Sequence, residues 1–338
     1  MLRSLFALGV LACALGVVGG ASASKPPASS STGSGSVFLP NPVADLQNQT
    51  LTDQNDSDAA VPGTAYHDVT LTNLDLSGFL QGDWANIRSS TGNLAYSASH
   101  TYRYTRHQDE FEQVMAYYWI TKAQTYIQSL GFGLTRRPIN MESQDVRINT
   151  WGLDNSFSWD KHDILRFGKG GVDDAEDAEV ILHEYGHAMM DSQQTPFGYG
   201  ASVEAGSIGE GFADYWAVTV STIFAPTLDA PCVADWDSVS YTSTVPHCLR
   251  RVDTNLQYPG DLNGRVHHDG MIWSRALWDI RGALGSTVAD TIILQGMFDM
   301  PDPTMPQLAT NTVAAALSLY GVAEANAVQT AFEARGIL

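Results

Sequence analysis

The chain has 338 residues, of which 44% are hydrophobic, and its formal net charge at pH 7 is -19. This apolar content excludes a wholly disordered chain, and the length allows one large domain or two modest domains with real cores. The strong negative charge disfavours nucleic-acid binding and adhesion to anionic membranes, so we expect neither kind of partner.

The N-terminus predicts an export signal. Arg3 precedes an uncharged apolar run over residues 5–18, and the small residues 21–23 (Ala-Ser-Ala) follow as a cleavage pattern. We predict a signal peptide over residues 1–23 and a mature protein that is extracellular or periplasmic, without stable membrane association. Two alternatives stay open: a transmembrane anchor, for which the apolar run is short, and a lipoprotein modified at Cys13.

Two cysteines remain once the signal peptide is removed, Cys232 and Cys248. An even pair in an exported protein favours a disulfide, and the alternative is two free buried thiols. The disulfide would close a loop in the second half of the chain.

Strands are expected in the first half of the chain. Residues 24–64 are rich in small and polar residues, which predicts a mobile linker. Alternation of apolar and polar residues over 66–87 predicts two or three short strands. Apolar residues at three- and four-residue spacing over 109–129 predict a helix that Gly131 stops. Residues 155–157 and 164–167 are the next strand candidates.

Helices are expected to dominate the rest. Asp173 and Asp174 are placed to cap a helix that runs to about residue 191, with calcium binding as the alternative role. Four further helices are predicted, over 208–220, 271–284, 289–295 and 313–319. We therefore expect an α+β fold, with a strand-rich subdomain over residues 65–195, a helical subdomain over 196–338, and the active-site cleft between them.

The segment His183-Glu184-Tyr185-Gly186-His187 carries the clearest chemical pattern. Side chains four residues apart lie on one face of a helix, so both imidazoles can reach one cation and Glu184 can reach a water beside it. This pattern predicts Zn²⁺ ligands at His183 and His187, and a general base at Glu184. A catalytic zinc site also needs a third protein ligand.

The third ligand is predicted at Glu210, on the next amphipathic segment. Asp214 follows one helical turn later, where it can accept the free ring N–H of a ligand histidine. The alternative for Glu210 is a solvated surface carboxylate, but the segment is otherwise poor in charge, which favours the ligand role.

Residues 173–217, with their HEYGH and GEGFADYWA elements, resemble the gluzincin metallopeptidases, and within them the fungalysin and thermolysin-like families. Residues 266–274 (VHHDGMIWS) resemble the fungalysin stretch whose histidine hydrogen-bonds the developing oxyanion, which implies that role for His267. The resemblance covers roughly residues 110–338. It implies a thermolysin-like fold of two subdomains and a secreted zinc endopeptidase that acts on peptide or protein substrates. We also expect the protein to be a monomer.

The resemblance also implies further site residues. Tyr199 is the nearest counterpart of the tyrosine that assists the oxyanion-binding histidine. Arg250 or Arg251 is placed to hold a substrate carbonyl, with a surface salt bridge as the alternative for each. Asn155 and Ser156 resemble the edge strand that pairs with an extended peptide. The acidic cluster that binds Ca²⁺ in thermolysin has no convincing counterpart, so a Ca²⁺ site stays open.

Two other functions stay open. One is a catalytically inactive zinc-binding or adhesive module on the same scaffold, because the register of the tyrosine is not secure and a full-length inhibitory propeptide is not found. The other is an aminopeptidase, since another gluzincin branch shares the ligands, although its Gly-x-Met-x-Asn type of motif is not found upstream of the zinc helix.

Overall fold

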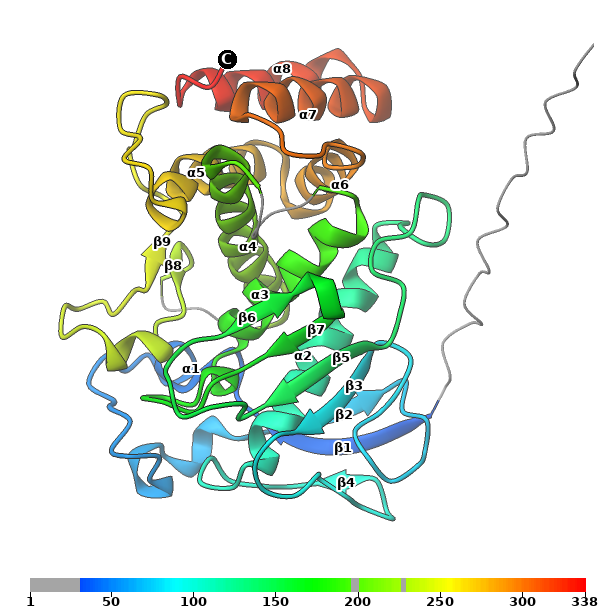
Figure 1. Cartoon of the computed structure of the whole chain (residues 1–338), viewed down its shortest axis with the longest axis vertical. Coiled ribbons are helices and arrows are strands. Elements are labelled where there is room, and N and C mark those ends of the chain that lie inside the picture. Colours follow the sequence, from blue (N-terminus) through cyan, green and yellow to red (C-terminus); the bar gives the residue numbers. More distant parts are fainter. Residues whose placement is uncertain (1–30, 196–200, 226–228) are drawn as a thin grey trace, which may run out of the picture.

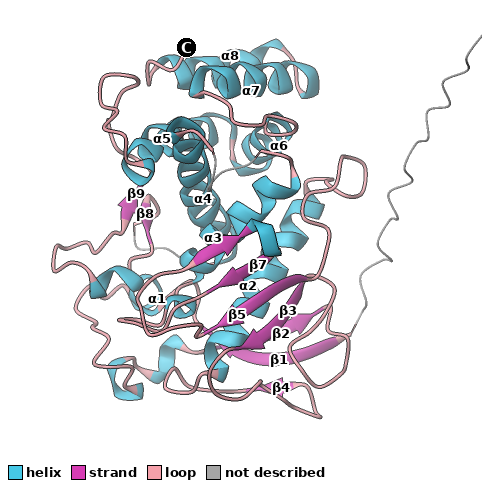
Figure 2. Cartoon of the chain, in the orientation of Figure 1, coloured by secondary structure: helices cyan, strands magenta, loops and turns pink. Residues whose placement is uncertain are grey.

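The computed structural model describes residues 31–195, 201–225 and 229–338, and strands dominate its N-terminal half while helices dominate its C-terminal half (Figures 1 and 2). This is the α+β arrangement that the sequence predicts. The predicted signal peptide and Tyr199 lie outside the described residues. None of the described helices has the length and hydropathy needed to cross a bilayer.

The strands form a three-stranded sheet, a four-stranded sheet and one short pair. In the first sheet, β1 (Thr32–Val37) lies between β2 (His67–Thr72), which is antiparallel to it, and β4 (Thr101–Tyr102), which is parallel. The second sheet has three parallel strands, β3 (Ala85–Ser89), β5 (Gln144–Ile148) and β7 (Ile164–Arg166). The antiparallel strand β6 (Phe157–Trp159) forms its edge beside β7. The short pair is β8 (Cys232–Val233) with β9 (Arg250–Arg251).

The helix α2 (Glu110–Ser129) packs against strands of both larger sheets. Its side chains are buried on almost every side, including Phe111, Trp119 and Ile127 at 0% exposure. The helix ends where the sequence predicts, because Gly131 takes a φ of +94°, which favours glycine. The nearly continuous apolar composition of this helix thus reflects its central position.

Residues 31–64 do not form the predicted mobile linker. β1 pairs with β2 over its whole length, and Val37 and Phe38 are fully buried. The segment continues through α1 (Pro42–Leu46), η1 (Asp58–Ala60) and η2 (Gly63–Ala65). Its small residues allow close packing, since a Cβ on Gly35 would lie 2.7 Å from Val114 Cγ1. Composition alone therefore misled the prediction.

The helices that follow build the rest of the molecule. α3 (Ala178–Ser192) packs against α4 (Val203–Phe224), which packs against α5 (Val266–Leu284). α6 (Ser286–Gly296), α7 (Met305–Leu319) and α8 (Val322–Glu333) complete the C-terminal half, with α7 and α8 at the top in Figure 1. The short 3-10 helices are η3 (Asp160–His162), η4 (Asp174–Glu176) and η5 (Asp237–Ser240). One hydrophobic core extends through both halves, from Val37 to Ile337.

The structure differs from the sequence prediction at two helix starts and in two further elements. The cap of α3 is Asp177, whose side chain accepts a hydrogen bond from Glu179 N at 2.9 Å, while Asp173 and Asp174 precede it at η4. α5 begins at Val266 rather than at residue 271. The strand β5 and the helix α8 were not predicted.

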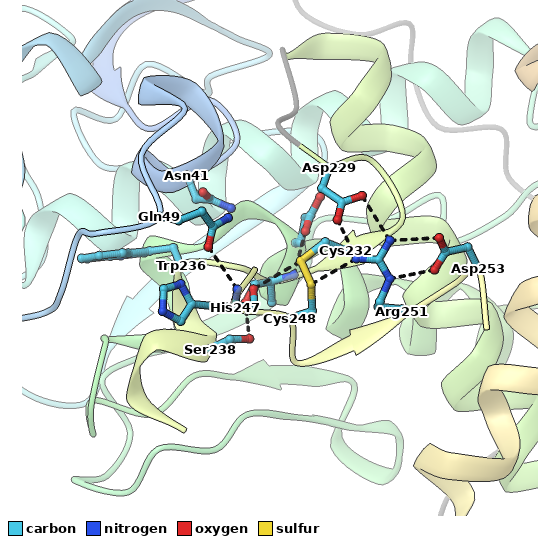
Figure 3. Close-up of a disulfide and its surroundings, with 12 residues drawn as sticks. Asn41, Gln49, Asp229, Cys232, Trp236, Ser238, His247, Cys248, Arg251 and Asp253 are labelled. Carbon is cyan, nitrogen blue, oxygen red and sulfur yellow. Dashed lines mark hydrogen bonds and ion pairs between the residues drawn. A yellow bond between two sulfur atoms is a disulfide. The ribbon is translucent and has the colours of Figure 1, made fainter. Parts of the chain in front are cut away.

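The predicted disulfide between Cys232 and Cys248 is present, with their Cα atoms 5.2 Å apart (Figure 3). It closes the segment between β8 and β9. Beside it, Arg251 forms ion pairs with Asp229 and Asp253, and Gln49 accepts a hydrogen bond from His247 N at 3.0 Å. The disulfide therefore ties the end of this segment to β8, next to a contact with the N-terminal half.

Candidate active site

Close helix packing brings the predicted metal-binding segments together. A Cβ on Gly186 of α3 would lie 3.2 Å from Ala213 Cα of α4. A Cβ on Gly270 of α5 would lie 2.8 Å from the carbonyl oxygen of Ser207 on α4. Glycine at these two positions lets three helices approach where their functional side chains lie.

The three predicted ligands converge. His183 Nε2 lies 3.2 Å from His187 Nε2 and 3.3 Å from Glu210 Oε2, and His187 Nε2 lies 3.8 Å from the same oxygen. Both histidines are buried, while Glu210 is partly exposed. Two imidazole nitrogens and a carboxylate oxygen therefore point at one small volume from two helices.

This donor set fits a zinc ion. Zinc bonds of about 2.0–2.1 Å in a tetrahedral site separate the ligand atoms by roughly 3.3–3.5 Å, close to the spacings among His183, His187 and Glu210. Two imidazoles and one carboxylate are also a common ligand set of catalytic zinc, in which the fourth position stays open. These three residues could hold the metal.

Asp214 connects the ligands to a buried arginine. Its Oδ1 lies 2.9 Å from His183 Nδ1, which matches the predicted role of Asp214 in orienting that imidazole. It also accepts two hydrogen bonds of 2.7 Å, from Nε and Nη2 of Arg250. The side chain of Asp214 is 1% exposed, so a single buried carboxylate fixes one side chain on α3 and one on β9.

A cavity of about 270 Å³ adjoins the ligands. His183, Glu184 and His267 contribute to its lining, and His267 Nε2 lies 3.3 Å from Glu210 Oε2. The remaining lining residues come from the loop before β6, from η4 and α3, and from the disulfide-closed segment and β9: Asp154, Asn155, Ser156, Asp174, Glu179, Val180, Val233, Ala234, Asp237, Tyr241, Leu249 and Arg250. The cavity thus lies beside the candidate metal site.

The electrostatics of the site differ from one group to the next. Burial raises the pKa of Glu184 to about 7, and the positive field of His183 only partly offsets it. Burial would lower the pKa of His183, but its bonds to Asp214 and Glu210 raise it to about 10. Burial lowers the pKa of His187 to about 3. Burial would raise the pKa of Glu210, but the histidines lower it to about 2, so this carboxylate is ionised.

Of the predicted substrate-binding residues, some line the cavity and one does not. Asn155 and Ser156 line the cavity just before the edge strand β6. Arg250 also lines it, whereas Arg251 is held by Asp229 and Asp253 and does not. The salt-bridge alternative thus describes Arg251. Tyr199 lies outside the described residues.

Sequence reasoning missed the acidic part of the cavity. Asp154 and Asp237 lie in or beside segments without periodic helix or strand patterns, so no spacing argument could have identified them. Asp174 was predicted only as a helix cap or calcium ligand, and Tyr241 was not singled out.

Comparison with known proteins agrees with this geometry. Residues 157–286 match the fungalysin metallopeptidase family, and this segment contains His183, His187, Glu210 and His267. Over this segment the chain is similar to the fungalysin metallopeptidases. The predicted gluzincin family of fungalysin and thermolysin-like enzymes is confirmed, as is the prediction of a zinc metalloendopeptidase.

The fold of this fungalysin-like chain is similar to that of a solved structure, the precursor of protealysin, a metalloproteinase from Serratia proteamaculans. The TM-score is 0.56 at 16% sequence identity, and the match covers 76% of this chain and 88% of that chain. The comparison with curated proteins gave no match. At this identity the structural likeness supports the fold, whereas the family match supports the metallopeptidase assignment.

Proposed function

We propose that this fungalysin-like metallopeptidase is an exported zinc endopeptidase that cleaves protein substrates with Glu184 as the general base. One observation carries the proposal: the nitrogens of His183 and His187 and an oxygen of Glu210 converge beside a cavity that Glu184 and His267 also line. Ligands, base and oxyanion donor are thus available at one place.

His183, His187 and Glu210 would hold the zinc ion. When bound, zinc acts as a Lewis acid and lowers the pKa of a water molecule towards neutrality. Asp214 accepts the Nδ1–H of His183, which leaves Nε2 of that ring free to act as a ligand.

Glu184 is suited to move the proton. It is 7% exposed, and burial is the largest influence on the pKa of its carboxylate. In the proposed reaction Glu184 takes the proton from the attacking water and passes it to the leaving amine. A pKa of about 7 suits both transfers, because a general base works best when its pKa lies near the working pH.

His267 is the proposed oxyanion donor. Its imidazole is 59% exposed and approaches Glu210 from the first turn of α5. A hydrogen bond from His267 to the developing oxyanion would stabilise the transition state. Arg250, fixed by Asp214 at the edge of the cavity, remains our candidate for holding a substrate carbonyl.

The substrate backbone is proposed to lie along the edge of the second sheet. Among the described strands, β6 has a neighbour on one side only, β7, and it packs against α3, which carries two of the proposed metal ligands. An extended peptide can add to such an edge through backbone hydrogen bonds that carry little sequence information. Asn155 and Ser156 precede this strand and line the cavity.

Two features support export. The sequence over residues 1–23 has the pattern of a signal peptide. The disulfide between Cys232 and Cys248 is the kind of bond that persists in oxidising compartments.

The metal role is tested with variants of two histidines. We expect the purified protein to contain zinc, to hydrolyse casein, and to lose hydrolysis with a chelator and regain it when zinc is restored. His187→Ala should lose both zinc and hydrolysis, because it removes one of three ligands. His268→Ala is the matched control. The Nδ1 atom of His268 is hydrogen-bonded to Asp269 Oδ1 at 3.0 Å, and His268 is not a proposed ligand. Retention of full zinc content by His187→Ala would contradict the ligand assignment.

A further inference from the structure

Three aspartates gather in the cavity beside the metal site. Asp154, Asp174 and Asp237 all line it, and one carboxylate oxygen of each lies within 4.8 Å of the others. Asp174 is 2% exposed and Asp237 is 3% exposed. They come from three separate segments, so only the fold brings them together.

These carboxylates lack a cationic partner in the part of the chain that the structure describes. Within the described residues, none of the three aspartates forms an ion pair with a lysine or an arginine. Arg250, the arginine that lines the cavity, forms its ion pair with Asp214 instead. In the same residues, Asp174 Oδ1 and Asp237 Oδ1 have no hydrogen-bond partner. The hydrogen bonds that the cluster does accept go to other oxygens. Ser156 Oγ and Gly168 N donate to Asp174 Oδ2, and Tyr241 donates to Asp154.

Such a cluster is unfavourable without a ligand. Buried carboxylates need pairing or hydrogen bonds to stay ionised. Burial together with repulsion from Asp154 raises the pKa of Asp174 to about 7, and burial with repulsion from Asp174 and Asp154 raises that of Asp237 well above its usual range. A cation that entered the cavity would restore the ionised state.

The other residues that line the cavity indicate which kind of cation would fit it. Val180, Val233 and Leu249 give the cavity apolar walls. Its volume of about 270 Å³ lies just below the roughly 300–1,000 Å³ of sites for small molecules, so it suits one side chain. Lysine and arginine combine an apolar stem with a charged head, and arginine presents five N–H donors in a planar fork.

We propose that this cavity takes the side chain of an arginine or lysine next to the scissile bond, so that the peptidase cleaves preferentially beside basic residues, arginine first. The proposal rests on the proposed function, because His183, Glu184 and His267 line the same cavity. Asp154, Asp174 and Asp237 are then the specificity-determining residues.

The test compares peptides that differ only at the two residues flanking the scissile bond, with arginine, lysine, methionine or glutamate at each in turn. Wild type is expected to cleave the best arginine peptide with a kcat/KM at least about 10-fold above that of its methionine counterpart, because charge-assisted hydrogen bonds are the strong ones. Asp237→Asn should lower kcat/KM for the arginine peptide by about 10-fold and change that for the methionine peptide far less, so that the ratio of arginine to methionine cleavage falls.

Asp235→Asn is the matched control. Asp235 is similarly buried, at 4% exposure, and lies two positions from Asp237, but it does not line the cavity. Its substitution should leave the ratio of arginine to methionine cleavage unchanged. The Tm of Asp237→Asn should equal or exceed that of wild type, because the change removes an unpaired buried carboxylate.

The outcomes separate this inference from the proposed function. Cleavage without a preference for basic residues would overturn the inference and leave the endopeptidase in place. No cleavage of any peptide or of casein would overturn both. If Ca²⁺ raised the Tm of wild type but not that of Asp237→Asn, and no basic preference were seen, the cluster would be a metal site and the inference would fall.

Discussion

Asp214 shows how one buried carboxylate can serve two functional side chains. It accepts from Nδ1 of His183 and holds the guanidinium of Arg250 with two hydrogen bonds. Burial alone would raise the pKa of Asp214, but Arg250 and His183 hold it well below its usual range. The carboxylate is therefore ionised and can act as a positioning group for the metal ligand.

Substitution of Asp214 should weaken metal binding. Asp214→Asn keeps the shape but removes the charge that orients His183, so we expect zinc affinity to fall by about 10- to 100-fold. Competition with a chromophoric chelator measures this. Asp279→Asn, which removes a partly exposed ion pair with Arg275 on α5, is the control and should not change the affinity. Unchanged affinity in Asp214→Asn would contradict the positioning role.

At the residue scale, the sequence predicted which side chains would lie close together at the candidate metal site. His183, His187, Glu210 and Asp214 lie on helices, where a spacing of four residues fixes a shared face. The acidic residues of the cavity were missed because Asp154 and Asp237 meet only through the tertiary fold.

Among the elements, the disulfide-closed segment shapes the cavity. Val233, Asp237 and Tyr241 all lie between Cys232 and Cys248, and all three line the cavity. The predicted metal ligands, in contrast, lie on α3 and α4. Under the proposed function, this segment would therefore shape the substrate-binding cavity rather than the metal site.

Removal of the disulfide should affect substrate binding without affecting zinc binding. The double variant Cys232→Ser with Cys248→Ser should be less stable by about 3 kcal/mol, as expected for a loop of this length. We expect a higher KM with zinc content unchanged, because the segment that lines the cavity becomes looser. Urea unfolding, metal analysis and peptide kinetics check this. Equal stability and equal KM would show that the loop is held by its other contacts alone.

Element prediction succeeded where periodicity was long. α2 and the helix that carries His183 and His187 were predicted from apolar spacing and caps. The folded segment 31–64 was missed because its glycines and serines pack closely instead of forming a linker. β5 was missed because five residues give too short an alternation to stand out.

The molecule as a whole buries many of its acidic groups. In the N-terminal half, Arg106 is fully buried between Glu176 and Asp53. Glu112 is also fully buried, and neither of its carboxylate oxygens has a hydrogen-bond donor among the described residues. Burial and the neighbouring carboxylates raise the pKa of Asp173 to about 8 and that of Glu112 well above its usual range.

These raised pKa values predict how stability depends on pH. Asp173 and Glu112 bind protons more tightly in the folded state than in the unfolded state, where the pKa is about 4. Their contribution to stability is complete below pH of about 4 and is lost as the pH rises through the folded pKa. The free energy of unfolding should therefore fall between about pH 5 and 8, by up to about 1.4 kcal/mol per pH unit and group.

Glu112→Gln tests this account, because the amide cannot ionise. Urea unfolding at several pH values should show a shallower fall of stability with pH in the variant than in wild type. The partly exposed position Glu324 supplies the control, Glu324→Gln, which should keep the wild-type slope. A free energy of unfolding that rises from pH 5 to 8 in wild type would contradict the prediction.

The central claim is that Glu184 acts as the base in a zinc peptidase site. The most direct measurement combines zinc content with casein hydrolysis for wild type and Glu184→Gln. We predict one zinc ion per chain in both proteins and a loss of hydrolysis by about 10²- to 10⁴-fold in the variant. Full hydrolysis by Glu184→Gln with its zinc retained would contradict the account.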